Sequence, residues 1–452
     1  MSEQARRFPP DFTWGAAIAS YQHEGATNED GRGESVWDRF CATPGKVRNG
    51  DSGAIACDFY HRYRDDIALM RELGIDAFRF SIAWPRILPN GRGAVNPKGL
   101  DFYDRVVDEL LGSGIEPFVT LFHWDTPQTL EDEGGWPVRA TVDAFSEFVE
   151  AVAGRLGDRV KTWITHNEPW VVSWIGYGWG HHAPGRTSDA DALATAHHLL
   201  LSHGRAVEIL RDLSPGSQVG ITLNLDHPTA ASDDPEDVAA ARWVDGMHNR
   251  WFLDPIFRGA YPSDMLEEFL PSMPAIEDGD LATIAAPIDF LGVNNYTTPV
   301  VAADANGGRP RIVHREDVDR TDMGWEIVPE GLHDMLVRVH QDYAPPAIYV
   351  TENGAAFADV RGHDGSVLDP ERQSYLVEYV DAAGRAMDEG VPLRGYFAWS
   401  LLDNFEWAWG YWKRFGLVYV DYATLERVPK GSFYWYRDFI ASTRVDADEA
   451  AA

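Results

Sequence analysis

The sequence predicts an α/β fold, a single (β/α)8 TIM barrel with long βα loops. Three observations support this prediction. An amphipathic helix, a glycine and an apolar strand follow one another repeatedly; eight segments have strand character; and no Pro/Ser-rich linker divides the 452 residues. Eight strands alternating with helices are typical of this barrel, which is longer than an average domain. We therefore expect one barrel domain over residues 1–444 and an acidic, Ala-rich, disordered tail over 445–452.

The repeated unit is clearest at residues 65–82, where a helix over 65–73 ends at Gly74 and a strand over 77–82 follows. The same order recurs in three stretches, with helices over 106–114, 145–157 and 375–390 preceding strands over 117–122, 160–164 and 393–399. We expect the glycine that ends each helix to adopt a left-handed cap. The remaining strands are expected at 12–18, 219–225, 288–293 and 348–350. Continuous apolar runs indicate strands buried on both faces.

The composition excludes several classes of partner. Asp and Glu total 71 against 39 Lys and Arg, a net charge of -32, so the chain should be repelled by nucleic acid and by anionic membranes. Cys41 and Cys57 are the only cysteines and lack the spacing of a zinc site. The amino terminus has no apolar signal core, and no apolar run is long enough to cross a bilayer. We expect a cytoplasmic protein.

Two glutamates carry the main functional signal. Glu168 stands in Thr-His-Asn-Glu-Pro after the strand at 160–164, and Glu352 stands in Tyr-Val-Thr-Glu-Asn-Gly after apolar residues from 347. Each carboxylate should lie where a buried strand meets a loop, and in one barrel both would face one pocket. Such a pair suits glycosidic bond cleavage, because one carboxyl can protonate the leaving oxygen while the other meets the charge developing on the sugar carbon. Alone, either motif is more typical of a turn.

Other strand ends carry polar or aromatic groups. Sugars require this mixture, since amides and carboxylates bind hydroxyl groups and flat indoles cover the apolar face of the ring. Any one of these residues could equally cap a loop or fill the core. The candidates are Gln22, Arg79, His123, Asn167, Asn224, Asn294, Tyr296, Trp399, Glu406 and Trp407.

Many motifs occur in order along residues 8–440. They include Phe-Thr-Trp-Gly at 12–15, Ser-Tyr-Gln at 20–22, Arg-Phe-Ser-Ile-Ala-Trp-Pro-Arg at 79–86, His-Trp-Asp at 123–125, His-Ala-Pro-Gly at 182–185 and Trp-Ser-Leu-Leu-Asp-Asn-Phe-Glu-Trp at 399–407. In these motifs the chain resembles the β-glucosidases of glycoside hydrolase family 1. The resemblance implies a retaining β-glycosidase that hydrolyses nonreducing-end β-D-glucosides, and also galactosides and fucosides, with a β-glycoside or cello-oligosaccharide as substrate and neither cofactor nor metal.

The resemblance also implies roles for individual residues. Glu352 would be the nucleophile and Glu168 the general acid and base, with the two carboxyls roughly 5 to 5.5 Å apart as in retaining enzymes. Arg79 and Tyr296 would orient the nucleophile, with Asn294 beside them. Residues implied to bind the sugar are Gln22, His123, Asn167, Asn294, Tyr296, Trp325, Trp399, Glu406 and Trp407, and those implied on the leaving-group side are Trp170, Trp325 and Phe415.

Three other functions fit the sequence less well. A metal-dependent barrel hydrolase would use His123, Asp125, His166, His181 and His182, but their spacing fits a zinc site poorly. A carbohydrate-binding protein without turnover would not need both carboxylates. A Schiff-base aldolase needs a lysine in the pocket, and none of the five lysines ends a barrel strand.

Overall fold

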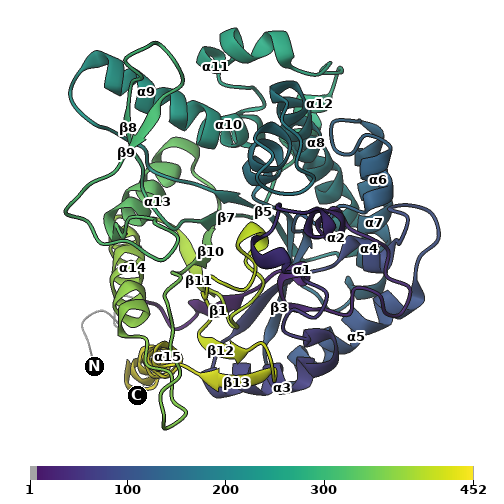
Figure 1. Ribbon diagram of the computed structural model, residues 1–452, viewed down its shortest axis with the longest axis vertical. Coiled ribbons are helices and arrows are strands. Elements are labelled where there is room, and N and C mark those ends of the chain that lie inside the picture. Colours follow the sequence, from purple (N-terminus) through teal and green to yellow (C-terminus); the bar gives the residue numbers. More distant parts are fainter. Residues whose placement is uncertain (1–7, 451–452) are drawn as a thin grey trace.

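The computed structural model describes residues 8–450 and contains a closed barrel of eight parallel strands, as predicted (Figure 1). Neighbouring strands follow the order β1-β11-β10-β7-β5-β4-β3-β2. The barrel strands are β1 (Thr13–Ala17), β2 (Ala77–Ser81), β3 (Glu116–Phe122), β4 (Thr162–Asn167), β5 (Gln218–Asn224), β7 (Phe290–Asn294), β10 (Ile348–Asn353) and β11 (Leu393–Trp399). Each of the eight predicted strands overlaps one of these barrel strands, so the apolar runs predicted the strands correctly.

Helices surround the barrel and connect its strands (Figure 1). The longer ones are α3 (Phe59–Leu73), α5 (Pro97–Gly112), α7 (Ala140–Leu156), α8 (Asp189–Leu213), α13 (Pro329–Tyr343), α14 (Pro370–Asp388) and α15 (Gly431–Ala450). Short helices are α1 (Ser20–His23), α2 (Val36–Ala42), α4 (Trp84–Ile87), α6 (Gln128–Asp132), α9 (Pro235–Asp245), α10 (Trp251–Arg258), α11 (Ser263–Phe269) and α12 (Asp280–Ile284). Single-turn or π-helical pieces are η2 (Arg48–Gly50), η3 (Val171–Gly178), η4 (Gly246–Arg250), η5 (Leu270–Ser272) and η6 (Trp407–Trp409).

The left-handed glycine predicted at four helix ends is confirmed at three of them. Gly74, Gly114 and Gly390 have φ of 76°, 73° and 92°. Gly157 was predicted wrongly, because its φ is -65°. A side chain there would approach two carbonyl oxygens at 2.6 Å, so close packing rather than a left-handed turn requires this glycine.

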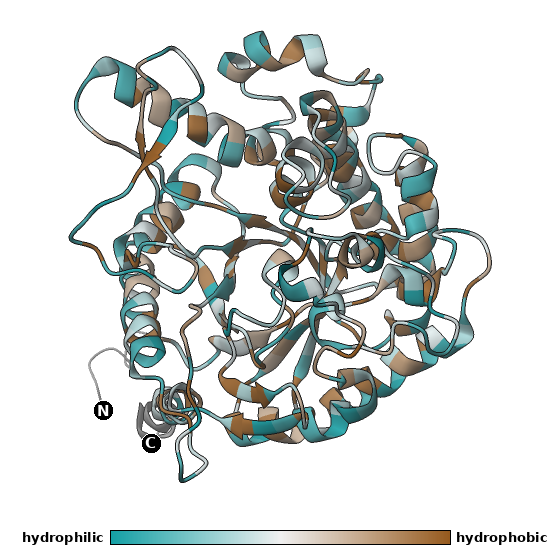
Figure 2. Ribbon diagram, in the orientation of Figure 1, coloured by the Kyte–Doolittle hydropathy of each residue, from teal (hydrophilic) through white to brown (hydrophobic). Residues whose placement is uncertain are grey.

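Two hydrophobic layers lie on either side of the barrel wall. One fills the space between strands and helices, and Figure 2 shows hydrophobic residues along the central strands with hydrophilic residues on outward helix faces. The other lies inside the barrel, where Phe118 packs against Tyr349 and Phe397 with ring centroids 5.5 and 4.8 Å apart. Because these rings fill the interior, a ligand must bind above them, at the ends of the strands.

The ends of β4 and β10 differ from the prediction. The polar residues 165–167 and 351–353 belong to the strands, so Glu352 lies within β10 rather than in a loop. The pairing register shifts at both ends, between Ile164 and Asn167 and between Val350 and Glu352. Glu168 follows β4 directly with φ 49°, a conformation uncommon outside glycine. Because β4 and β10 run parallel in one closed barrel, both glutamates lie at the same end of the barrel.

Short strands and the carboxyl-terminal helix complete the chain. β6 (Thr229–Ala230), β8 (Val300–Ala302) and β9 (Arg311–Val313) form one small sheet, and β12 (Val418–Asp421) and β13 (Glu426–Pro429) form another. The backbone of 445–450 continues α15, and the disordered tail over 445–452 stays a prediction. Residues 1–7, which carry the prediction about a signal core, and 451–452 lie outside the described residues. Within residues 8–450, no helix combines the length and apolarity needed to cross a membrane.

Candidate active site

A cavity of about 750 Å³ lies where the barrel strands end. Most of the predicted site residues line it: His123, Glu168, Trp170, Asn224, Asn294, Tyr296, Trp325, Glu352, Trp399, Glu406, Trp407 and Phe415. Gln22, Arg79 and Asn167 do not line it, but each is hydrogen-bonded to a residue that does. The structure therefore brings all the predicted residues into one assembly with an inner supporting layer.

Glu352 is held by a cation and a phenol. The buried Arg79 guanidinium, on β2, donates a hydrogen bond to Oε1 of Glu352, and the Tyr296 hydroxyl donates to Oε2 at 2.6 Å. Arg79 also donates to Asn167 Oδ1 at 2.5 Å. Burial, and then the Glu352 and Glu168 charges, raise the pKa of Tyr296 well above its usual value, so the phenol keeps its proton. Both oxygens of Glu352 thus accept hydrogen bonds, one from a charged donor and one from a neutral donor.

Glu168 has a different environment. Its Oε1 accepts a hydrogen bond of 2.5 Å from the side-chain amide of Asn294. Thr351 donates to the other end of that amide at 2.7 Å, which fixes its orientation. Burial raises the pKa of Glu168 well above its usual value, and the nearby charge of Glu352 raises it further, while the Asn294 hydrogen bond opposes the rise. Burial and the Glu352 charge therefore both favour the protonated form of Glu168.

Glu406 and Gln22 form a polar corner of the cavity. The Gln22 amide donates to Glu406 Oε2 at 3.3 Å and to Asn404 Oδ1 at 3.0 Å. Burial and the charge of Glu352 raise the pKa of Glu406 to about 8, although the Gln22 hydrogen bond acts against this. A buried carboxyl with few partners is suited to exchanging hydrogen bonds with ligand hydroxyl groups.

His123 lies between the polar corner and the indole rings. Asn167 Nδ2 is 3.1 Å from His123 Nε2, and the imidazole is stacked on Trp399 and Trp407 with centroids 6.0 and 5.9 Å apart. Burial, with the Arg79 charge, lowers the pKa of His123 well below its usual value, so the ring is neutral. A neutral imidazole beside two indoles offers both hydrogen bonds and an apolar face.

The side chains predicted on the leaving-group side form two groups. Trp325 and Phe415 pack together with centroids 6.1 Å apart, and both contact the ring of Tyr296. Trp170 lies apart from them, 4.2 Å from the ring of His248. Two separate groups of aromatic rings therefore line the cavity: Trp325 with Phe415, and Trp170 with His248.

Several residues that line the cavity were not among the predicted site residues. Trp124 donates from its indole to the carbonyl of Asn167 at 2.9 Å, and it could have been found because it directly follows His123. Asp226 follows Asn224 by two residues, so the end of β5 also held a usable signal. His248 comes from η4, far from any strand end in the sequence, and no local pattern marked it.

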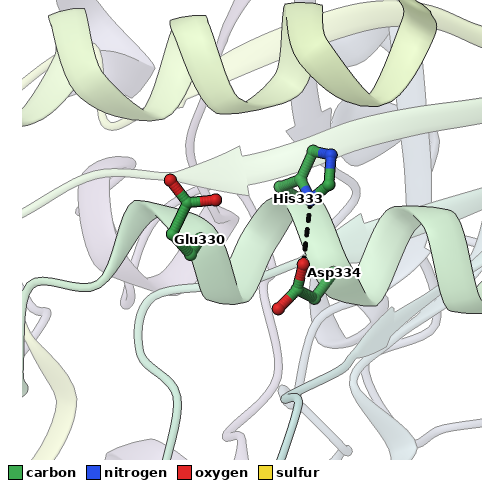
Figure 3. Close-up of side chains that lie close together, drawn as sticks. All are labelled: Glu330, His333 and Asp334. Atoms are coloured by element: carbon green, nitrogen blue, oxygen red, sulfur yellow. Dashed lines mark hydrogen bonds and ion pairs between the residues drawn. The ribbon is translucent and has the colours of Figure 1, made fainter. Parts of the chain in front are cut away.

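The five candidate metal ligands do not converge. His166 bonds Ser202 at 2.8 Å, and Asp125 accepts from Ser20 at 3.0 Å. Among residues 8–450, the one group of such side chains with ligand atoms within 4.8 Å of one another is Glu330, His333 and Asp334 on α13 (Figure 3).

That group on α13 is already engaged in other contacts. His333 has ring nitrogens 2.9 Å from Asp334 and 3.0 Å from Glu389, and Glu330 accepts two hydrogen bonds from Arg385. None of the three lines the cavity, and within the described chain no lysine does. The contacts tie α13 to α14, and neither the metal alternative nor the aldolase alternative gains support from the cavity.

Comparisons with known proteins agree with this geometry. The family described as Glycosyl hydrolase family 1 matches residues 4–445. The chain is 49% identical over 440 residues to β-glucosidase A of Acetivibrio thermocellus, which covers 96% of this chain and 98% of that protein. It is 45% identical over 457 residues to a bifunctional β-D-glucosidase/β-D-fucosidase of Bifidobacterium breve, with 96% and 98% covered.

A solved structure extends the likeness to the fold. The β-glucosidase of Thermotoga maritima in complex with glucoimidazole superposes with a TM-score of 0.95 and 48% identity, covering 97% of this chain and 99% of that one. The match spans nearly the whole of both chains, so it includes the barrel and the loops that surround the cavity. The chain belongs to glycosyl hydrolase family 1.

Proposed function

We propose that this glycoside hydrolase is a retaining β-glucosidase in which Glu352 is the nucleophile and Glu168 the general acid and base. The observation that carries the proposal is the contrast between the two carboxyls. Glu352 accepts hydrogen bonds from Arg79 and Tyr296, whereas Glu168 is buried beside a neutral amide with a raised pKa. A double displacement requires one carboxyl held in place for attack and one that can carry a proton to the leaving oxygen.

In the first step, an oxygen of Glu352 forms a bond to the anomeric carbon while the bond from that carbon to the leaving oxygen breaks. The proton of Glu168 goes to the leaving oxygen, so the alcohol departs neutral and Glu168 becomes a carboxylate. Arg79 and Tyr296 hold Glu352 in place for this attack. The expected separation of roughly 5 to 5.5 Å between the carboxyls leaves no room for a water molecule between Glu352 and the sugar.

In the second step, Glu168 removes a proton from water, whose oxygen bonds to the anomeric carbon as the bond to Glu352 breaks. The covalent ester removes the negative charge of Glu352, which is one of the causes of the raised pKa of Glu168. The pKa of Glu168 therefore falls between the two steps, which suits its change from acid to base. Two inversions at the same carbon return the β configuration.

We also propose a binding role for the remaining predicted residues. Gln22, His123, Asn167, Glu406 and Trp407 bind hydroxyl groups of the nonreducing-end sugar, with Asn167 at the 2-hydroxyl and Trp399 under the ring. Asn294, Tyr296 and Trp325 complete the sugar site, and Trp170, Trp325 and Phe415 face the leaving group. The proposal is supported by the presence of these residues in or directly behind one cavity.

Glu406 favours unphosphorylated substrates. A buried carboxyl near the sugar hydroxyls exchanges hydrogen bonds with them but offers no positive charge to a phosphate dianion, which would lose its hydration there without compensation. We propose β-glucosides as substrates, including cello-oligosaccharides, with β-galactosides and β-fucosides also cleaved, as the name of the Bifidobacterium breve relative indicates for fucosides in that protein.

The test of substrate class compares kcat/KM for p-nitrophenyl β-glucoside with that for its 6-phosphate, with and without EDTA. We expect cleavage of the first, little of the second and no effect of EDTA. A preference for the phosphate would overturn the substrate class while leaving the roles of the two glutamates open.

A cytoplasmic location stays part of the proposal and is supported by the buried, unpaired Cys41 and Cys57, which suit a reducing compartment.

A further inference from the structure

A third carboxyl lines the cavity and has no part in the mechanism above. Asp226 follows the end of β5 by two residues, and 24% of its side-chain surface is exposed. No described residue donates a hydrogen bond to this carboxylate, and the nearest basic nitrogen is His248 Nε2 at 3.8 Å. Its oxygens are therefore available to a ligand, although the surroundings are dry enough that burial raises the pKa of Asp226 to about 7.

The backbone of Asp226 is fixed on both sides. Its N–H donates to Asn249 Oδ1 at 3.3 Å, and its carbonyl accepts from Asn249 Nδ2 at 2.8 Å. That amide also donates to Asp245, which is in turn held by Arg250 and Arg338. The network thus fixes the backbone of Asp226 at this side of the cavity, while its carboxylate takes no part in the network.

Contacts place Asp226 on the side of the cavity next to Glu168. Trp170 follows Glu168 by two residues, and its ring lies 4.2 Å from the ring of His248, which faces Asp226. The charge of Asp226 also contributes to the raised pKa of Glu168, so the two carboxyls are near each other. Glu168 protonates the leaving oxygen in the proposed mechanism, which makes this the leaving-group side.

We propose that Asp226 is a specificity-determining residue that accepts hydrogen bonds from hydroxyl groups of a leaving-group sugar lying against Trp170 and His248. An indole face beside a carboxyl oxygen that no other group engages is the combination that a sugar ring binds. The inference rests on the proposed function, since it takes Glu168 as the acid. It predicts a preference for glycosyl leaving groups over alkyl groups of the same size.

The test uses two substrates whose leaving groups both need a proton. Cellobiose presents hydroxyl groups to Asp226, whereas cyclohexyl β-glucoside presents a ring of similar size without them. We expect Asp226→Ala to lower kcat/KM for cellobiose about 10- to 100-fold, and for the cyclohexyl glucoside less than about threefold. Asp226→Asn should lie between, because its amide oxygen is a neutral acceptor. Asp233→Ala, which removes the same charge from an exposed loop, should change neither value.

A second measurement follows the covalent intermediate. Glucose and methanol both accept the sugar from Glu352, but only glucose has hydroxyl groups to bind Asp226, so Asp226→Ala should reduce transfer to glucose and spare transfer to methanol. Equal losses for cellobiose and the cyclohexyl glucoside would mean that Asp226 acts only through Glu168 or the fold, and unchanged cellobiose activity would place the sugar elsewhere. Either result overturns the proposal. If the unaltered enzyme cleaved neither substrate, the proposed function itself would fail.

Discussion

The two glutamates lie at the same end of one barrel, yet different groups surround their carboxyls. Glu352 accepts hydrogen bonds from a guanidinium and a phenol, and both stabilise its charge. Glu168 accepts one from an amide, and in the described chain it forms no ion pair, so burial and the charge of Glu352 favour its protonated form. In the proposed mechanism, the neighbours of each carboxyl, not its residue type, would make Glu352 the nucleophile and Glu168 the acid.

The largest effect should come from removing the charged partner of this pair. Glu352→Ala takes away the atom that bonds to the sugar, so we expect kcat to fall at least about 10⁴-fold for every leaving group. Azide should then restore turnover and give an α-glycosyl azide, because it attacks from the vacated face. Product configuration can be read by NMR. A β product, or near-normal activity without azide, would show that the comparison assigns the roles wrongly.

Removing Glu168 should give a loss that depends on the leaving group. Dinitrophenol departs without a proton, so Glu168→Ala should impair cleavage of alkyl glucosides far more than that of dinitrophenyl β-glucoside. Azide should here give a β-glycosyl azide. In the unaltered enzyme, activity on alkyl glucosides should be lost as pH rises through the raised pKa of Glu168, because the acid form exists only below it. An equal loss for both substrates would leave Glu168 a structural role only.

Tyr296→Phe should have a smaller effect that is independent of the leaving group. The substitution keeps the ring contacts with Trp325 and Phe415 and removes the hydrogen bond of 2.6 Å to Glu352. Loss of one bond to a charged group predicts a fall in kcat/KM of about 10- to 100-fold. Measuring alkyl and dinitrophenyl glucosides side by side checks this. A loss confined to alkyl glucosides would tie Tyr296 to the acid instead of the nucleophile.

The sequence predicted the barrel well because buried parallel strands are apolar along their whole length. It missed the last residues of β4 and β10, since Thr165 and Thr351 are polar although they continue the strands. Polar side chains there support the cavity from behind, as Thr351 does by its hydrogen bond to Asn294, and an apolar run cannot reveal them. The left-handed cap predicted at Gly157 was wrong, because a glycine that close packing requires looks the same in the sequence as a glycine that caps a helix.

Site residues were predictable where they sit at strand ends and not where they arrive from helices. His123 and Asn294 follow from the barrel alone, because the ends of β3 and β7 meet the cavity. His248 depends on how η4 packs over β5, which is a tertiary contact without local pattern. The inner position of Arg79 behind Glu352 was likewise set by packing, although its strand was known.

The smallest effect should appear in stability and should have opposite signs at the two glutamates. The pKa of Glu168 is raised in the folded protein, so this acid binds its proton more tightly there than in the unfolded chain. It therefore destabilises the fold as pH rises above its ordinary pKa. The free-energy cost reaches about 1.4 kcal/mol for each unit by which the pKa is raised. Glu168→Gln should therefore raise Tm at pH 8 by a few degrees and change it little at pH 4. Glu352→Gln should lower Tm at pH 8, because it leaves the buried Arg79 guanidinium without its anionic partner. Calorimetry at the two pH values measures both changes in Tm. If Glu168→Gln melted at a lower temperature than the unaltered protein at pH 8, Glu168 would be stabilised as an anion. The contrast between the two carboxyls would then be lost.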